Sequence, residues 1–135
     1  MNLDLKRSIL IVDDQDNWRK ALTSLLTQEG HTVKTLSRFE EAEKEISQSA
    51  FDLVILDLRL VDAEFFNVQG LELLRLVKAK KAAPRVIILT GYPESLRLGV
   101  QEYGADALVL KVPQDSRFDI KGFKAQVQSL LQHKS

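Results

Sequence analysis

The sequence contains no cysteine, so the chain has no disulfide framework, no thiol nucleophile and no cysteine metal site. Its 19 basic and 19 acidic residues cancel, which leaves no overall charge to attract nucleic acid or an anionic membrane. No apolar run approaches the ~20 residues of a membrane span, and residues 1–7 lack the apolar core of a signal peptide. With 44% hydrophobic and 28% charged residues in 135 positions, we expect a soluble, cytoplasmic, single domain without membrane or direct nucleic-acid contacts.

The chain is organised around one short apolar run, from Phe51 to Asp57, that ends in an aspartate. A continuous run of Leu, Val and Ile is typical of a parallel strand that is buried on both faces. Similar runs predict three more strands, at residues 8–12, 85–89 and 107–110. Residues 32–36 alternate apolar and polar side chains, which predicts a further strand nearer the edge of the sheet.

Segments with helical periodicity separate these strands and follow the last one. Apolar residues recur at helical spacing from Trp18 to Gly30, after Ser37, after Gly70, across about 94–103 and across about 118–132. Ser37, with Glu40 three residues later, is predicted to cap the second helix. Trp18 is expected to pack at the base of the first helix, and a place near the acidic residues before it is the alternative.

The alternation of strand and helix, without internal repeat or linker, predicts a doubly wound α/β domain. For this size we expect a five-stranded parallel sheet in the flavodoxin-like order 2-1-3-4-5, with helices on both faces. The predicted core extends from about residue 8 to about residue 132.

Polar side chains lie at the carboxyl ends of four predicted strands, and these ends meet at one edge of a parallel sheet. They are Asp13 and Asp14, Asp57, Thr90, and Lys111. Three close carboxylates repel each other unless a cation shares the site, and oxygen-only ligation suits Mg²⁺. Together with an ammonium and a hydroxyl, they form an apparatus for moving a phosphoryl group onto Asp57.

Four motifs, in this order, resemble the receiver domain of a two-component response regulator. They are ILIV before Asp13 and Asp14, LVIL before Asp57, IIL before Thr90, and LVL before Lys111. The resemblance extends from residue 9 to about residue 131, and it implies that residues 1–135 form a single receiver domain.

The resemblance implies a role for each acidic residue. Asp57 would be the phosphoacceptor and would also contact Mg²⁺. Asp14 would be a direct Mg²⁺ ligand, and Asp13 would act mainly through water. The backbone carbonyl of Arg59 would be a third protein ligand.

The resemblance also implies a switch and its partners. Lys111 would hold a phosphoryl oxygen, and Thr90 would move toward it. The donor would be a sensor histidine kinase or a phosphotransfer protein, and the output would be a downstream protein or a fused domain. Homodimer formation stays open. Such a domain is not an enzyme, although it promotes its own phosphoryl transfer and dephosphorylation.

The chain departs from the family pattern at three places. Loop 58–69 is roughly five residues longer than usual, and loops of this length are uncommon without a role. The other two departures flank the lysine: Leu108 replaces the usual aromatic residue, and Val112 separates Lys111 from Pro113.

Two alternatives remain beside the phosphorylation switch. Leu108 favours the first, a receiver-like interaction module that is not phosphorylated and that uses the fourth helix and fifth strand, or Phe65 and Phe66 of the long loop. The second is a Mg²⁺-dependent phosphatase with Asp57 as nucleophile. It is disfavoured because Arg59 stands where such enzymes usually have an acid.

Overall fold

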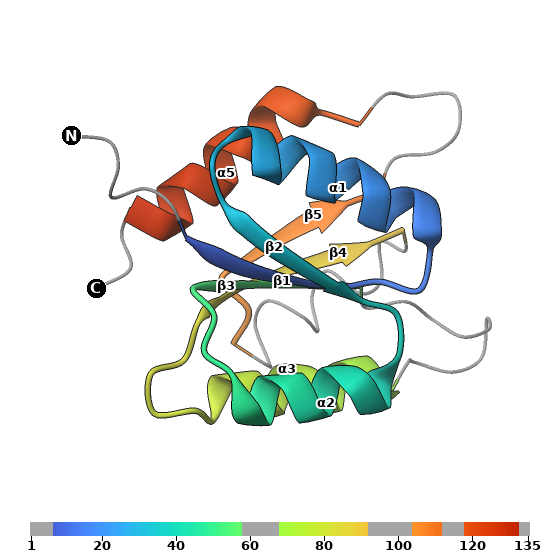
Figure 1. Cartoon of the computed structure of the whole chain (residues 1–135), viewed down its shortest axis with the longest axis vertical. Helices are drawn as coiled ribbons and strands as arrows, with labels where there is room; N and C mark the ends of the chain where they lie inside the picture. Colours follow the sequence, from blue (N-terminus) through green and yellow to red (C-terminus); the bar gives the residue numbers. More distant parts are fainter. Residues whose placement is uncertain (1–6, 58–67, 92–103, 112–117, 133–135) are drawn as a thin grey trace.

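The computed structural model describes residues 7–57, 68–91, 104–111 and 118–132. They form a parallel sheet of five strands in the order β2-β1-β3-β4-β5, as predicted (Figure 1). The strands are β1 (Ser8–Val12), β2 (Thr32–Leu36), β3 (Leu53–Asp57), β4 (Arg85–Thr90) and β5 (Ala107–Leu110). The chain therefore crosses from β2, over β1, to β3.

Helices cover both faces of the sheet. They are α1 (Asp16–Gln28), α2 (Phe39–Gln48), α3 (Val68–Lys78) and α5 (Ile120–Gln132). Figure 1 shows α1 and α5 on one face and α2 and α3 on the other. The helix predicted over 94–103 lies outside the described residues. The doubly wound α/β class is confirmed.

The central strands are buried on both faces, as their uninterrupted apolar sequences predicted. In β1, Ile9 and Ile11 pack into the core beneath α1 and α5, whereas Leu10 and Val12 pack into the core above α2 and α3. Strand β3 alternates in the same way. The two apolar cores thus fix the register of the sheet, because a slip of one residue would move every side chain of a strand to the opposite face.

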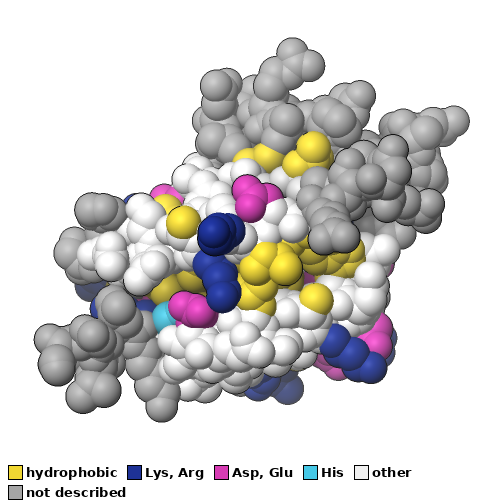
Figure 2. All heavy atoms as spheres, turned by 90° about the horizontal axis from the view of Figure 1, so that it is seen from above, with side chains coloured by type: hydrophobic (Ala, Val, Ile, Leu, Met, Phe, Trp, Pro, Cys, Tyr) yellow, Lys and Arg dark blue, Asp and Glu magenta, His cyan; other side chains and the backbone are white. Residues whose placement is uncertain are grey.

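The outer layer formed by α1 and α5 carries charges of both signs. Figure 2 looks onto this layer and shows basic and acidic side chains next to small hydrophobic patches. Lys124 of α5 and Glu29 at the end of α1 form an ion pair, with Nζ 3.3 Å from Oε2. This pair links the two helices on the solvent side.

Two predicted helix starts are wrong by one or two residues. Helix α2 is preceded by Arg38, which is still extended at φ −128° and ψ 145° and makes no side-chain capping hydrogen bond. The Ala42 N–H donates to the Arg38 carbonyl, so Ser37 lies one position too early to be the cap. Helix α3 begins at Val68, two residues before Gly70.

A partly buried carboxylate, that of Asp106 directly before β5, ties three elements together. Asp106 accepts hydrogen bonds from the Val86 N–H at 2.8 Å, from Lys78 Nζ at 3.1 Å and from Arg85 Nη1 at 3.2 Å. Burial raises the pKa of this carboxyl, but the hydrogen bonds from Val86 and Lys78 outweigh burial and lower its pKa overall.

Replacing Asp106 by alanine is therefore expected to lower the free energy of unfolding by about 1–2 kcal/mol at pH 7. The lowered pKa means that the native state favours the ionised form, so this contribution is present above pH 4 and is lost as the pH falls below it. Urea unfolding at pH 7 and pH 3 measures both effects. Equal stability of the two proteins at pH 7 would contradict the expectation.

Candidate functional site

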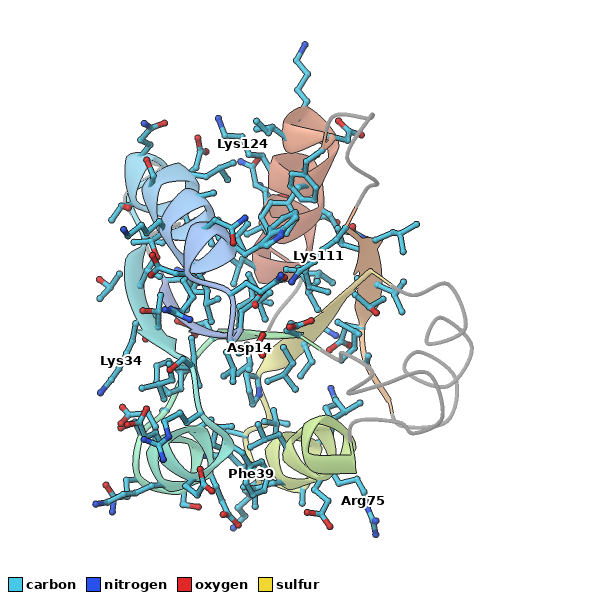
Figure 3. The ribbon with its side chains drawn as sticks, turned by 90° about the vertical axis from the view of Figure 1, so that its right-hand side faces the viewer. Asp14, Lys34, Phe39, Arg75, Lys111 and Lys124 are labelled. Atoms are coloured by element: carbon cyan, nitrogen blue, oxygen red, sulfur yellow. The ribbon has the colours of Figure 1, made fainter. Side chains whose placement is uncertain are left out.

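Three carboxylates meet at the carboxyl edge of the sheet, where β1 and β3 lie side by side. Asp13 and Asp14 follow β1, and Asp57 is the last residue of β3. One carboxylate oxygen from each lies within 4.8 Å of the other two. Figure 3 shows Asp14 and Lys111 close together at this edge, between the two helical layers. The predicted cluster of acidic residues is thus present, and it has the composition of a metal site.

The backbone around Asp13 is held by three hydrogen bonds. Its N–H donates to the carbonyl of Leu36 at 3.1 Å, and its own carbonyl accepts from Arg19 Nη1 at 2.7 Å. Its Oδ1 accepts from the backbone N–H of Gln15 at 2.9 Å. These contacts leave Oδ2 of Asp13 directed toward Lys111, whose Nζ lies 3.0 Å away as an ion pair outside hydrogen-bond geometry.

Asp57 is the most perturbed group of the site. Burial, followed by the negative charge of Asp13, raises the pKa of Asp57 to about 7, although Lys111 opposes the rise. Among the described residues, its buried Oδ1 has no hydrogen-bond partner. A divalent cation beside this oxygen would satisfy it and favour the ionised carboxylate. Oxygen-only donors with an unsatisfied buried carboxylate fit Mg²⁺.

Lys111 reaches the site from the end of β5. Its backbone N–H donates to the carbonyl of Thr90 at 2.6 Å, and its Nζ lies 3.6 Å from Oδ2 of Asp57. Thr90 is the last residue of β4 and is fully buried. The structure therefore brings Lys111 to the carboxylates and places Thr90 at the same edge of the sheet.

Two further residues of the first loop and helix contact this lysine. Gln15 accepts a hydrogen bond from Lys111 Nζ at 2.7 Å, and the Trp18 ring centroid lies 5.0 Å from Nζ. Trp18 thus fulfils both alternatives, because it also packs edge-on against Phe118 in front of α5. Sequence reasoning missed Gln15, and the only signal was its position directly after Asp14.

Several predicted features lie outside the described residues. These are the carbonyl of Arg59, the long loop with Phe65 and Phe66, and the segment with Val112 and Pro113. Leu108, which occupies the position of the usual aromatic residue, is partly buried and packs against the core above α2 and α3.

Three carboxylates and a largely enclosed lysine thus lie at the carboxyl edge of a doubly wound parallel sheet in the order 2-1-3-4-5, where such sheets place their functional sites. The family model described as "Response regulator receiver domain" matches residues 9–119. The chain belongs to this family.

Proteins similar to the chain include response regulators from several bacteria. The response regulator ArlR of Staphylococcus epidermidis is 31% identical over 125 residues, which cover 92% of this chain and 52% of that protein. The chain spans about half the length of the curated relatives that it matches.

None of the helices in the described ranges is long and apolar enough to cross a membrane.

Solved structures with the same fold include the response regulator TrrA of Thermotoga maritima in complex with Mg²⁺ and BeF. It is 33% identical, with a TM-score of 0.73, and the match covers 92% of this chain and 98% of TrrA. A second structure shows TrrA in complex with the histidine kinase ThkA. There the identity is 32%, the TM-score is 0.68, and the match covers 93% of this chain and 98% of that one.

Proposed function

We propose that this domain is a phosphorylation-dependent switch in which Asp57 accepts a phosphoryl group in a Mg²⁺-dependent reaction. The observation that carries the proposal is the position of Asp57 in the site. Its carboxylate ends β3 beside those of Asp13 and Asp14, and Lys111 Nζ is 3.6 Å from its Oδ2. The proposed nucleophile Asp57, the carboxylates that would bind the metal and the cation of Lys111 therefore lie close enough together to contact one transferred phosphoryl group.

In the proposed reaction, a carboxylate oxygen of Asp57 attacks the phosphorus of a phosphohistidine. The new O–P bond forms as the N–P bond breaks, and the imidazole nitrogen leaves with the electron pair of that bond. Lys111 and the hydroxyl of Thr90 stabilise the charge on the transferring oxygens. Asp13, Asp14, Asp57 and the carbonyl of Arg59 would hold Mg²⁺, which neutralises further charge on those oxygens when it is bound.

The donor in this proposal is a sensor histidine kinase or a phosphotransfer protein. The structure of TrrA with the histidine kinase ThkA supports a kinase as partner for a similar receiver domain. The greater length of ArlR supports output through a fused domain, with a separate downstream protein as the alternative. The protein would act in the cytoplasm as a phosphoacceptor and not as an enzyme on a separate substrate.

Phosphorylation would shift an existing equilibrium of the surface around Thr90 and β5. A large apolar residue, Leu110 at the end of β5, is exposed in this region. Its exposure supports this surface as the one that changes its contacts.

The test is the intact mass of the protein after incubation with a small phosphodonor such as acetyl phosphate. We expect one phosphoryl adduct on the native chain with Mg²⁺, none with EDTA and none on Asp57→Asn. Asp52→Asn is the matched control, because Asp52 precedes the same strand and accepts from the Ser8 N–H at the other edge. A native chain that neither forms the adduct nor binds Mg²⁺ would instead support the unphosphorylated interaction module.

A further inference from the structure

The ammonium of Lys111 is held by two uncharged groups in addition to its acidic partners. Nζ donates to Oε1 of Gln15 at 2.7 Å and lies 5.0 Å from the ring centroid of Trp18. The lysine side chain is only 9% exposed. We call Gln15 and Trp18 the lysine cradle.

The aromatic half of the cradle is supported from behind. Phe118 meets the Trp18 ring edge-on, with centroids 5.1 Å apart, and Phe118 in turn lies 5.5 Å from the buried ring of Phe123. Gln15 is fixed through its backbone, because its N–H donates to Oδ1 of Asp13. Both parts of the cradle are therefore anchored to rigid elements, α5 on one side and the end of β1 on the other.

In the resting structure, Lys111 Nζ lies closer to Asp13 than to Asp57. It is 3.0 Å from Oδ2 of Asp13 but 3.6 Å from Oδ2 of Asp57, which is too far for a hydrogen bond. A phosphoryl group on Asp57 would extend outward from that carboxylate and place new oxygens nearer to the ammonium. Lys111 then needs only a small shift to meet them.

We propose that the cradle positions Lys111 for the reaction at Asp57 and releases it to the phosphoryl group. Gln15 and Trp18 are positioning residues, since they act through Lys111 and contact no reacting atom. The inference rests on the proposed function, because it needs phosphorylation of Asp57.

Uncharged partners suit this role for a physical reason. A lysine has a flexible four-carbon stem, and ordering it during the reaction would cost conformational entropy. The cradle orders the stem beforehand, and the amide oxygen and the indole face attract the cation without neutralising its charge. Gln15 and Trp18 thus add no negative charge to that of Asp13 and Asp57, and the ammonium stays available to the arriving phosphoryl oxygens.

The first test uses fluorescence, because Trp18 is the single tryptophan of the sequence. In the resting protein, Lys111→Met removes the ammonium from the ring and is expected to change the Trp18 emission. Beryllium fluoride with Mg²⁺ is expected to shift the native emission toward that of resting Lys111→Met. Lys34→Met is the control and should leave the emission unchanged, since Lys34 pairs with Glu45 of α2 on the other face.

The second test measures the rate of adduct formation by intact mass at saturating Mg²⁺. Gln15→Ala and Trp18→Leu are each expected to slow phosphorylation about tenfold, because each leaves the ammonium less well positioned for the transferring oxygens. Trp18→Tyr keeps an aromatic face and is expected to retain a rate near that of the native chain. Gln15 is a partly exposed loop residue, so Gln15→Ala keeps the test valid if Trp18→Leu does not fold.

The outcomes separate this inference from the proposed function. If the native chain forms no adduct, the proposed function fails and the role of the cradle fails with it. If the native chain is phosphorylated, but Gln15→Ala reacts at the native rate or beryllium fluoride leaves the native Trp18 emission unchanged, the cradle alone is overturned. Slower reaction together with rescue by Trp18→Tyr supports it.

Discussion

Replacing Asp57 by asparagine is expected to raise the free energy of unfolding of the metal-free protein by about 2–4 kcal/mol at pH 8. Burial, and then the charge of Asp13, raises the pKa of Asp57 from 3.8 to about 7 in the native state. Between pH 4 and pH 7 the native state therefore binds more protons than the unfolded state. The native chain should lose stability as the pH rises through this window, whereas asparagine carries no charge to be penalised.

Urea unfolding in EDTA at pH 5 and pH 8 measures this effect. The difference between Asp57→Asn and the native chain should be large at pH 8 and small at pH 5. Mg²⁺ should reduce the difference at pH 8, because a bound cation stabilises the ionised native site. The control Asp52→Asn should not be more stable than the native chain, because Asp52 lies outside the acidic cluster and its carboxylate accepts a hydrogen bond from the Ser8 N–H. Equal stability of Asp57→Asn and the native chain at pH 8 would mean that the site is not destabilised by its own charge.

Replacing Lys111 by methionine is expected to slow phosphorylation of Asp57 by about a hundred- to a thousandfold, as is typical when one preorganised charge is removed from a reacting centre. Methionine keeps a long apolar stem, so the change removes the ammonium 3.6 Å from Asp57 Oδ2 and preserves much of the packing under Trp18. Time courses of adduct formation by intact mass at saturating Mg²⁺ give the rate.

The matched control for this substitution is Lys34→Met, whose lysine is half exposed and pairs with Glu45 far from the acidic cluster. It should react at the native rate. Mg²⁺ affinity should not fall in Lys111→Met, because the variant removes a cation that competes for Asp13. A rate within twofold of the native one would exclude Lys111 from the proposed transfer.

The sheet could be predicted from the sequence because its central strands carry strong local signals. An uninterrupted apolar run such as Leu53 to Leu56 fits a strand with helices on both faces, and the alternation with helical segments then restricts the topology. The same topology brings Asp13, Asp57 and Lys111 to one edge, so their meeting was predictable before any distance was known.

The cradle could not be predicted in this way. The hydrogen bond between Lys111 and Gln15 joins positions 96 residues apart, and neither residue belongs to a pattern that specifies the other. Their contact depends on the orientation of α1 over the sheet and on Phe118 behind Trp18, which are tertiary features. The prediction that Ser37 caps α2 was wrong for a different reason. A capping box is a purely local pattern, and in the structure the backbone stays extended for one residue beyond Ser37.

In the proposed function, the order of the strands along the chain also affects how soon a newly synthesised copy could react efficiently. All three carboxylates belong to the first 57 residues, but Lys111 follows β5, which pairs with β4 and comes last along the chain among the five described strands. A nascent chain with β1 and β3 already made would carry the acidic half of the site without its cation. The proposed transfer would therefore be slow until β5 has been translated and has joined the sheet, as it is expected to be in Lys111→Met.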